Sequence, residues 1–160
     1  MQNIRRHSEE TVGIETESVY DVMLIPLKFL SDIWYHAYPL IVKGQTANPE
    51  LSMDDIMNGL VDQSIQLWIV VRKNRKKLLA VFLTSIEKDR EDWVLSLYNL
   101  GGEAAKDWAM DCHRTMHDFA KSEGCQRVRM CGRPAWQRIL PNYPIVGERG
   151  GHFIYERPTV

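Results

Sequence analysis

The sequence lacks any long hydrophobic run, and its apolar stretches all fall short of the roughly 18 continuous residues that a membrane-spanning helix needs. It also lacks an apolar N-terminal stretch of the kind that marks a signal peptide. Cysteine is scarce and odd in number: Cys112, Cys125 and Cys131 form no C-x-x-C pair. These absences argue against membrane and disulfide-rich classes, and they predict reduced thiols in a cytoplasmic protein.

An excess of charge of either sign is missing as well. Lys and Arg number 20 and Asp and Glu number 21, which gives a net charge of −1. Such a balance gives no support for a general nucleic-acid or membrane surface. The one basic cluster, RKNRKK at residues 72–77, lies between two apolar runs, so we expect a solvated hairpin turn. Its five positive charges also make it the best candidate surface for an acidic partner.

The sequence does contain enough apolar residues for a sizeable core. Apolar types make up 44% and charged types 26% of the 160 residues, as in ordinary globular proteins. At this length one domain is the simplest expectation. Residues 1–13, MQNIRRHSEETVG, are polar and without clear periodicity, so we expect a polar N-terminal arm there and a single domain over residues 14–160.

The first third of the domain has the pattern of a strand and two helices. The apolar run at 22–25 predicts a strand, and Pro26 then suits the first turn of a helix. Gly44 is the expected end of that helix, whose buried face is predicted by apolar residues at three- and four-residue spacing: Leu27, Leu30, Trp34, Tyr38 and Ile41. Ser52 suits the N-cap of a second, shorter helix.

The remainder of the chain alternates between strands and helices. Three runs rich in β-branched and aromatic residues predict strands at 65–71, 78–86 and 92–100. The clearest helix follows, with one apolar face made by Trp108, Cys112, Thr115, Met116 and Phe119. A strand, a short helix and a final strand are expected at 125–130, 132–140 and 152–156. The order β-α-α-β-β-β-α-β-α-β predicts an α/β fold: a mixed, mostly antiparallel twisted sheet of about six strands, with helices on both faces.

Two adjacent glycines, Gly101 and Gly102, connect the third of these central strands to the clearest helix. The unpaired N–H groups and positive dipole end of a helix suit a phosphate, and glycine lets the backbone approach a ligand. Carboxylates at Glu103 and Asp107 would instead repel phosphate and stabilise the helix without a ligand, while Lys106 acts in the opposite sense. Two interpretations therefore stay open: a cradle for a phosphorylated cofactor, and a tight turn that starts a helix.

Several motifs together carry a resemblance to a known family. They are QLWIVV, LYNLGG, the helix that contains Trp108, FAKSEGC ending at Cys125, and GRPAWQRILPNY at 132–143. From about Val22 to Glu156 the chain resembles the GNAT superfamily of acyl-CoA N-acyltransferases, and within it the GNAT-like proteins encoded by tailed bacteriophages.

The resemblance implies an N-acetyltransferase that transfers an acyl group directly from acetyl-CoA to an unknown amine. It implies that acetyl-CoA or CoA binds at Tyr98, Leu100, Gly101, Gly102, Glu103, Ala104, Ala105, Lys106, Arg133 and Trp136. In this interpretation Arg133 and Trp136 form an arginine and aromatic wall beside the ligand groove. The structural alternative is that Trp136 packs the short helix onto the sheet.

Transfer to an amine needs a base, a donor to the thioester carbonyl and an acid for the departing thiolate. The N–H near Leu100 suits the donor. Glu87 and Asp92 are the base candidates, although both also suit a solvated turn. Tyr143 and Tyr98 are the acid candidates, and buried tyrosines are equally ordinary core residues.

The chain departs from the superfamily pattern at three places. Its loop reads GGEAA at 101–105, where (Q/R)-x-x-G-x-(G/A) is usual. Near the start of the short helix, Gly132-Arg133-Pro134 stands where an Asn is usual. Ile139 and Leu140 stand near the usual position of the acid tyrosine, and Tyr143 follows slightly later. A second function is therefore open: a non-catalytic phage virion or assembly component, or an inhibitor of a host protein, with the same fold. Both functions imply that the protein is located in the bacterial host cytoplasm, and the second function also implies a place in the phage particle. The candidate surfaces for a protein partner are the two termini and the RKNRKK turn.

His113 and His117 stand four residues apart on the clearest helix, next to Cys112, a spacing that can chelate a metal. The motif HRTMH lacks the Glu of H-E-x-x-H and a third ligand. We therefore expect a packing or surface role for both histidines and no metal site.

Overall fold

The computed structural model describes residues 19–47, 51–74, 77–103, 105–132, 136–140 and 143–160. Within these residues one seven-stranded sheet has the order β1-β2-β3-β4-β5-β7-β6. Its strands are β1 (Tyr20–Leu24), β2 (Gln66–Arg72), β3 (Lys77–Asp89), β4 (Asp92–Gly102), β5 (Arg127–Gly132), β6 (Ile145–Arg149) and β7 (His152–Pro158). The helical segments are η1 (Leu27–Phe29), α2 (Leu30–Ala47), α3 (Met53–Asp62), α4 (Ala105–Ser122) and α5 (Trp136–Ile139).

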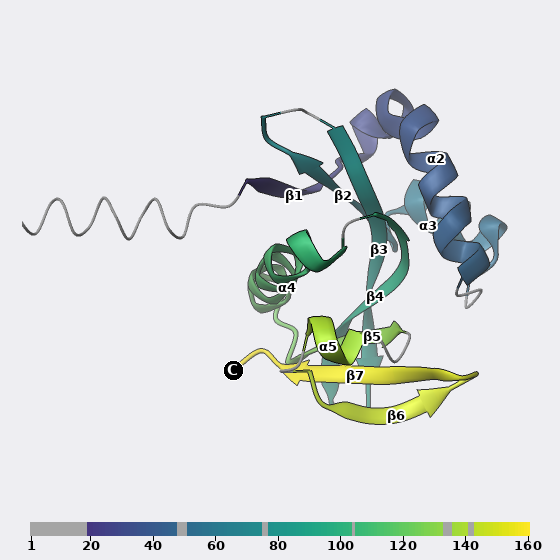
Figure 1. Ribbon diagram of the computed structural model, residues 1–160. Coiled ribbons are helices and arrows are strands. Elements are labelled where there is room, and N and C mark those ends of the chain that lie inside the picture. The colour runs from purple at the N-terminus through teal and green to yellow at the C-terminus, as the bar shows by residue number, and fades with distance from the viewer. Residues whose placement is uncertain (1–18, 48–50, 75–76, 104, 133–135, 141–142) are drawn as a thin grey trace, which may run out of the picture.

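Neighbouring strands are antiparallel except for β4 and β5, which are parallel. A parallel pair needs a crossover connection, and α4 supplies it. Figure 1 shows α2 and α3 on one side of the sheet and α4 on the other. The expected mixed sheet with helices on both faces is therefore confirmed.

Strand β3 is buried on both faces because it separates two hydrophobic cores. Phe82 belongs to the core beneath α4, together with Trp108 and Met116. Val81 and Leu83 point to the other face and pack in the core beneath α2 and α3. Successive side chains of a strand alternate between faces, so the apolar run of β3 serves both layers.

Three expected boundaries are wrong, and all three errors concern glycine. Gly132, expected to begin the short helix, is the last residue of β5. Helix α2 continues through Gly44 to Ala47, and Gly44 is buried. The backbone of Gly44 lies beside Gly101 of β4, so its missing side chain allows close packing rather than ending the helix. Gly101 and Gly102 are themselves the last residues of β4, not a turn.

The structure adds one strand to the six that the sequence predicts. Ile145–Arg149 forms β6 at the edge of the sheet and pairs with β7, with an irregularity between Ile145 and Gly147.

The expected N-cap is confirmed: the Ser52 hydroxyl caps α3 by accepting from the Asp55 amide at 3.1 Å. The expected arm at 1–13 lies outside the described residues, and none of the helices that are described is long and apolar enough to cross a membrane.

Candidate functional site

Strands β4 and β5 part within the sheet. Their paired residues end at Leu97 and Met130, although β4 continues to Gly102 and β5 to Gly132. Among the described strands none pairs with this edge of β4 beyond Leu97. Backbone N–H and C=O groups are strong hydrogen-bonding groups, so the opening is a place where an extended ligand can pair with β4.

A bulge lies in β4 at the same place. Val81 pairs with Gly101 and Leu83 pairs with Tyr98, so β4 uses three residue steps where β3 uses two. Bulges redirect backbone and side chains and are frequent near active sites. The Leu100 amide, the predicted donor to a thioester carbonyl, belongs to this segment, whereas the Leu100 side chain lies outside what the structure describes.

Both glycines at the end of β4 have structural reasons to be glycine. A Cβ on Gly101 would lie 2.0 Å from the Leu40 carbonyl oxygen of α2. A Cβ on Gly102, whose φ is +157°, would lie 2.4 Å from the Cβ of Ala80 and 2.5 Å from the Leu79 carbonyl oxygen. Close packing of β4 on α2 and β3 thus accounts for the pair without any ligand. A role of either glycine in binding a diphosphate stays a prediction.

Glu103, between β4 and α4, is held by three contacts. Its amide donates to the Leu79 carbonyl at 3.1 Å, and its carbonyl accepts from the Trp108 indole N–H at 2.7 Å. Its carboxylate pairs with the Lys77 ammonium at 2.9 Å, and this hydrogen bond lowers the pKa of Glu103. Lys43 of α2 approaches the same turn and donates to the carbonyl of the preceding residue at 3.5 Å. Two lysines therefore offset the carboxylate that the sequence places beside the predicted phosphate site.

The other predicted binding residues are only partly described. Ala105 is half-buried at the first position of α4, and Lys106 is exposed. Ala104 and Arg133 lie outside the described residues. Trp136 begins α5 and packs against the core beneath α4. Its indole lies so close to Gly132 that a Cβ added to this glycine would be 2.8 Å from the ring. This contact supports the packing interpretation of Trp136.

Glu87 is the centre of a polar cluster on the face of the sheet that carries α2 and α3. The Tyr98 hydroxyl donates to one carboxylate oxygen of Glu87, and the Ser85 hydroxyl donates to the same oxygen at 3.0 Å. The Ser96 hydroxyl donates to the other oxygen at 3.2 Å. Burial, followed by the Glu87 hydrogen bond, raises the pKa of Tyr98 to about 12. Tyr98 therefore stays protonated at neutral pH and acts as a donor to the carboxylate.

A cavity of about 40 Å³ adjoins this cluster at the point where β4 and β5 part. Leu97 and Cys131, which lie at and just beyond the last paired residues, both line it. The full lining is Glu87, Ser96, Leu97, Tyr98, Arg129, Cys131, Arg149 and Ile154. The candidate base and the opening in the sheet therefore meet in one pocket.

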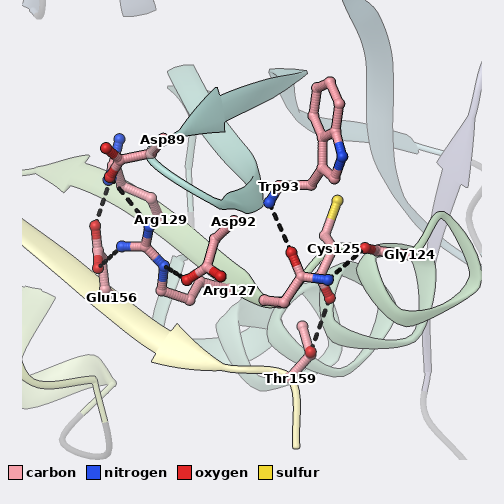
Figure 2. A network of polar contacts seen from close by, with 10 residues as sticks. Asp89, Asp92, Trp93, Gly124, Cys125, Arg127, Arg129, Glu156 and Thr159 are labelled. Atoms are coloured by element: carbon pink, nitrogen blue, oxygen red, sulfur yellow. Dashed lines mark hydrogen bonds and ion pairs between the residues drawn. The ribbon is translucent and has the colours of Figure 1, made fainter.

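An ion-pair network holds the pocket wall on β5 in place (Figure 2). Arg127 donates to Glu156 at 2.7 Å, to Asp89 at 3.1 Å and to Asp92 at 3.2 Å. Arg129 donates to the other oxygen of Glu156 at 2.6 Å and also to Asp89. The hydrogen bonds from Arg129 and Arg127 lower the pKa of Asp89. Asp92, the second base candidate from the sequence, thus serves a structural ion pair.

Tyr143 lies on the opposite face of the sheet from Glu87. It is buried in the core beneath α4 and lines a small apolar cavity with Leu97, Trp108 and Trp136. Burial is the main reason that its pKa is raised, so its hydroxyl stays protonated. The structure therefore does not bring the two candidate catalytic residues together, and both roles stay predictions.

The two histidines of α4 attach the C-terminal strand to the helix. Arg157 of β7 donates to His113 Nε2 at 3.1 Å, so the neutral ring carries its proton on Nδ1 and donates to the Tyr143 hydroxyl at 2.8 Å. His117 Nε2 donates to the Thr159 carbonyl at 3.0 Å. The expected packing role is thereby confirmed, and the part of the chain that is described holds no cluster of three metal-ligating side chains.

We expect a pH dependence of stability from His113. Burial, followed by the nearby Arg157, lowers the pKa of His113 from 6.5 to about 4. The unfolded chain therefore binds more protons between these values, and the free energy of unfolding falls as pH drops through that window. His113→Gln should flatten the dependence of the unfolding midpoint between about pH 7 and about pH 5. The exposed His36→Gln is the control; equal slopes in both variants would contradict the assignment.

The sequence reasoning missed Ser85, Ser96, Arg129 and Arg149 in this site. A pattern in the sequence indicates three of them, Ser85, Ser96 and Arg129. Polar residues stand at every second position of β3, β4 and β5, and such positions point to one face of the sheet. Arg149 has no such local signal, because β6 brings it to the pocket from the far edge of the sheet.

No protein-family model and no curated protein matches the sequence. The fold is similar to three solved structures, among others. FeeM, an N-acyl amino acid synthase from uncultured soil microbes, has a TM-score of 0.63 at 7% identity over 87% of this chain and 89% of its own. A GNAT-family acetyltransferase from Listeria monocytogenes has a TM-score of 0.57 at 8% identity over 87% and 94%.

The third is N-acetylglutamate synthase from Neisseria gonorrhoeae in complex with coenzyme A and N-acetyl-glutamate. Its TM-score is 0.57 at 12% identity, over 91% of this chain and 36% of that larger chain. At such identities the likeness concerns the fold alone. The chain has the fold of the GNAT N-acyltransferases.

Proposed function

We propose that this protein is an acyl-CoA-dependent N-acyltransferase that transfers an acetyl group directly to a small amine. The observation that carries the proposal is the position of Glu87. A carboxylate held by three hydroxyl groups faces a pocket at the point where β4 and β5 part. A base beside an opening that can receive an extended thioester is the arrangement that acyl transfer to an amine needs.

The residues around the opening fit an acyl-CoA. The edge of β4 beyond Leu97 offers backbone groups for an extended arm, and the N-terminus of the 18-residue α4 suits a diphosphate. Lys43 and Lys77 stand beside that turn and offset the charge of Glu103. When bound, acetyl-CoA supplies an acyl group activated as a thioester. The fit to acyl-CoA therefore rests on the backbone groups of β4 and α4 and on the charges of the two lysines. Gly101 and Gly102 are explained by packing instead.

Each residue of the site has one proposed task. Glu87 accepts the proton that the amine loses, and the hydroxyl groups of Tyr98, Ser85 and Ser96 hold the carboxylate in position. The Leu100 amide in the bulge donates to the acyl oxygen, where negative charge develops. Tyr143, protonated on the other face of the opening, is the proposed proton source for the leaving sulfur.

Mass spectrometry of a panel of amines incubated with acetyl-CoA and the protein tests the proposal. We expect one class of amines to be acetylated at a rate that exceeds the background without protein. No acetylated product from any amine, with acetyl-CoA intact, would contradict it.

The charge of the β4–α4 turn gives a second prediction. Lys43→Glu combined with Lys77→Glu should weaken CoA binding about tenfold or more, which corresponds to about 1.4 kcal/mol or more, because both ammonium groups would face the diphosphate. Calorimetric titration measures the effect. Lys28→Glu with Lys121→Glu makes the same charge change at exposed positions near the opposite ends of α2 and α4. Equal affinities of the two double variants would place CoA elsewhere.

A non-catalytic role is the second candidate, and one observation favours it. Packing against α2 and β3 explains Gly101 and Gly102 without a ligand, so the glycines do not by themselves require CoA. In this role the protein would be a phage virion or assembly component or would bind a host protein, as the motif resemblance predicts. In the RKNRKK turn, Lys73 pairs with Asp21 at 3.7 Å and Lys77 pairs with Glu103, while residues 75–76 lie outside the described part. The amine assay separates the two candidates.

A further inference from the structure

The two edges of the sheet differ, and we propose that β1 pairs with β1 of a second copy of the chain, so that two sheets join into one. β1 is the outermost strand at one end of the described sheet, and β6 is outermost at the other (Figure 1). An exposed strand edge presents backbone N–H and C=O groups that can pair with another strand. The pairing uses neither the pocket beside Glu87 nor the opening between β4 and β5, so it is independent of the proposed function.

β6 carries the features that usually protect an edge. Its register with β7 is irregular between Ile145 and Gly147, and the strand ends in two charged residues. β1 lacks these features. Its register with β2 is regular, and its one charged residue, Asp21, pairs with Lys73 at 3.7 Å. Charges and bulges discourage pairing at an edge, so of the two edges β1 is the one open to a partner strand.

The backbone of β1 alternates between β2 and the outer edge. The Val19 carbonyl and the Ile25 amide each form a 2.9 Å hydrogen bond with the backbone at the two ends of β2. In an antiparallel ladder every second residue directs its N–H and C=O groups to the same side, so the odd-numbered residues of this strand face β2. Val22 and Leu24 therefore direct theirs to the outer edge, where the described sheet has no further strand.

Apolar side chains are exposed along the same edge. Met23 and Leu24 are 40% and 42% exposed, although both belong to a strand of the sheet. The segment that follows, η1, adds the exposed side chains of Leu27 and Phe29. A cavity of about 260 Å³ lies beside Leu24, between the ends of α3 and α4, so neither helix closes over this end of β1. Exposed apolar surface of this kind marks interaction sites.

The sequence of β1 selects one register for the pairing. In this register Val22 of each copy pairs with Leu24 of the other, and Met23 lies opposite Met23 of the second copy on a two-fold axis. A register centred on Val22 would set the charge of Asp21 against Met23, and one centred on Asp21 would set two carboxylates against each other. A register centred on Leu24 would bring Pro26, which has no N–H, into the ladder. The two-fold pairing closes on itself, so the assembly is a dimer.

Sedimentation velocity of the full-length protein over about 1 to 100 µM tests the pairing. We expect the wild type to form a species with twice the mass of one chain. Met23→Asp and Met23→Lys should each weaken the dimer about tenfold or more, because each sets two like charges opposite each other at the axis. An equimolar mixture of the two variants should restore the dimer, since opposite charges then meet. Restoration also shows that both variants are folded.

Met57→Asp is the matched control, because Met57 is also an exposed methionine but lies on α3. This variant should form the dimer as the wild type does. A wild-type protein that stays monomeric at about 100 µM would overturn the proposal. So would a Met23→Asp dimer as stable as that of the wild type, or a mixture of the two charged variants that stays monomeric, since Met23 would then not face its own copy across the axis.

Discussion

Glu87→Gln should lower kcat/KM for acetyl transfer by about 10²- to 10⁴-fold, the usual contribution of a positioned general base. Glutamine has the shape of glutamate: its amide oxygen can still accept from Tyr98 and Ser85, and its amide nitrogen can donate to the Ser96 hydroxyl, so the local structure should persist. The amide cannot take up the proton that the amine loses. We therefore expect the rate of transfer to fall while the affinity for acetyl-CoA, measured by calorimetric titration, stays the same.

Two variants show whether the loss is specific to the base. Glu91→Gln removes one negative charge from the exposed turn between β3 and β4 and should leave the rate within about twofold of the wild type. Tyr98→Phe removes one donor to the Glu87 carboxylate and should lower the rate by less than Glu87→Gln does. A Glu87→Gln variant as active as Glu91→Gln would rule out Glu87 as the base.

Gly101→Ala should cost about 3 kcal/mol of stability, at the upper end of the cost of overpacking a core. The added Cβ would lie 2.0 Å from the Leu40 carbonyl oxygen, which belongs to the backbone of α2 and has no alternative rotamer. For a protein of this length the unfolding midpoint should fall by about 6 to 12 °C. Thermal unfolding without ligand measures the effect.

Gly147→Ala is the matched control, since a Cβ there would meet Ile154 at an ordinary 3.4 Å and the midpoint should shift by no more than about 2 °C. The comparison also resolves the question that the glycine pair poses in the sequence. A purely ligand-binding Gly101 would lose CoA affinity on substitution and keep its stability. A midpoint for Gly101→Ala equal to that of the wild type would mean that α2 and β4 do not pack as closely as described.

The order of elements could be predicted from the sequence because each depends on local patterns. The apolar face of α4, the N-cap Ser52 and the β-branched and aromatic runs of β2, β3 and β4 are local patterns, each contained within one turn or one strand. The role of a glycine could not be predicted where it depends on contacts that are distant in the sequence. Gly44 lies within α2 because β4 packs on it, and no residue near Gly44 in sequence reports that contact.

The site could be predicted only in part, for the same reason. Glu87 and Tyr98 stand out as polar residues at strand positions, and the structure places them in direct contact. Arg149 could not be predicted, because Ile145–Arg149 is a short edge strand with Gly147 at its centre, exposed apolar residues and an irregular register. Its place beside Glu87 depends on the order of strands across the whole sheet, which is a property of the fold.

Thermal unfolding of the wild-type protein with and without acetyl-CoA tests the central claim most directly, since it requires no knowledge of the acceptor. Ligand at about 100 times its Kd adds about 2.7 kcal/mol of stability by mass action, which is a rise of about 5 to 10 °C in the midpoint for a domain of this size. We expect that rise in the wild type and a smaller one in the Lys43→Glu, Lys77→Glu double variant. An unchanged midpoint at millimolar acetyl-CoA would contradict the account. The protein would then have the opening between β4 and β5 as part of its fold but would not bind acetyl-CoA there.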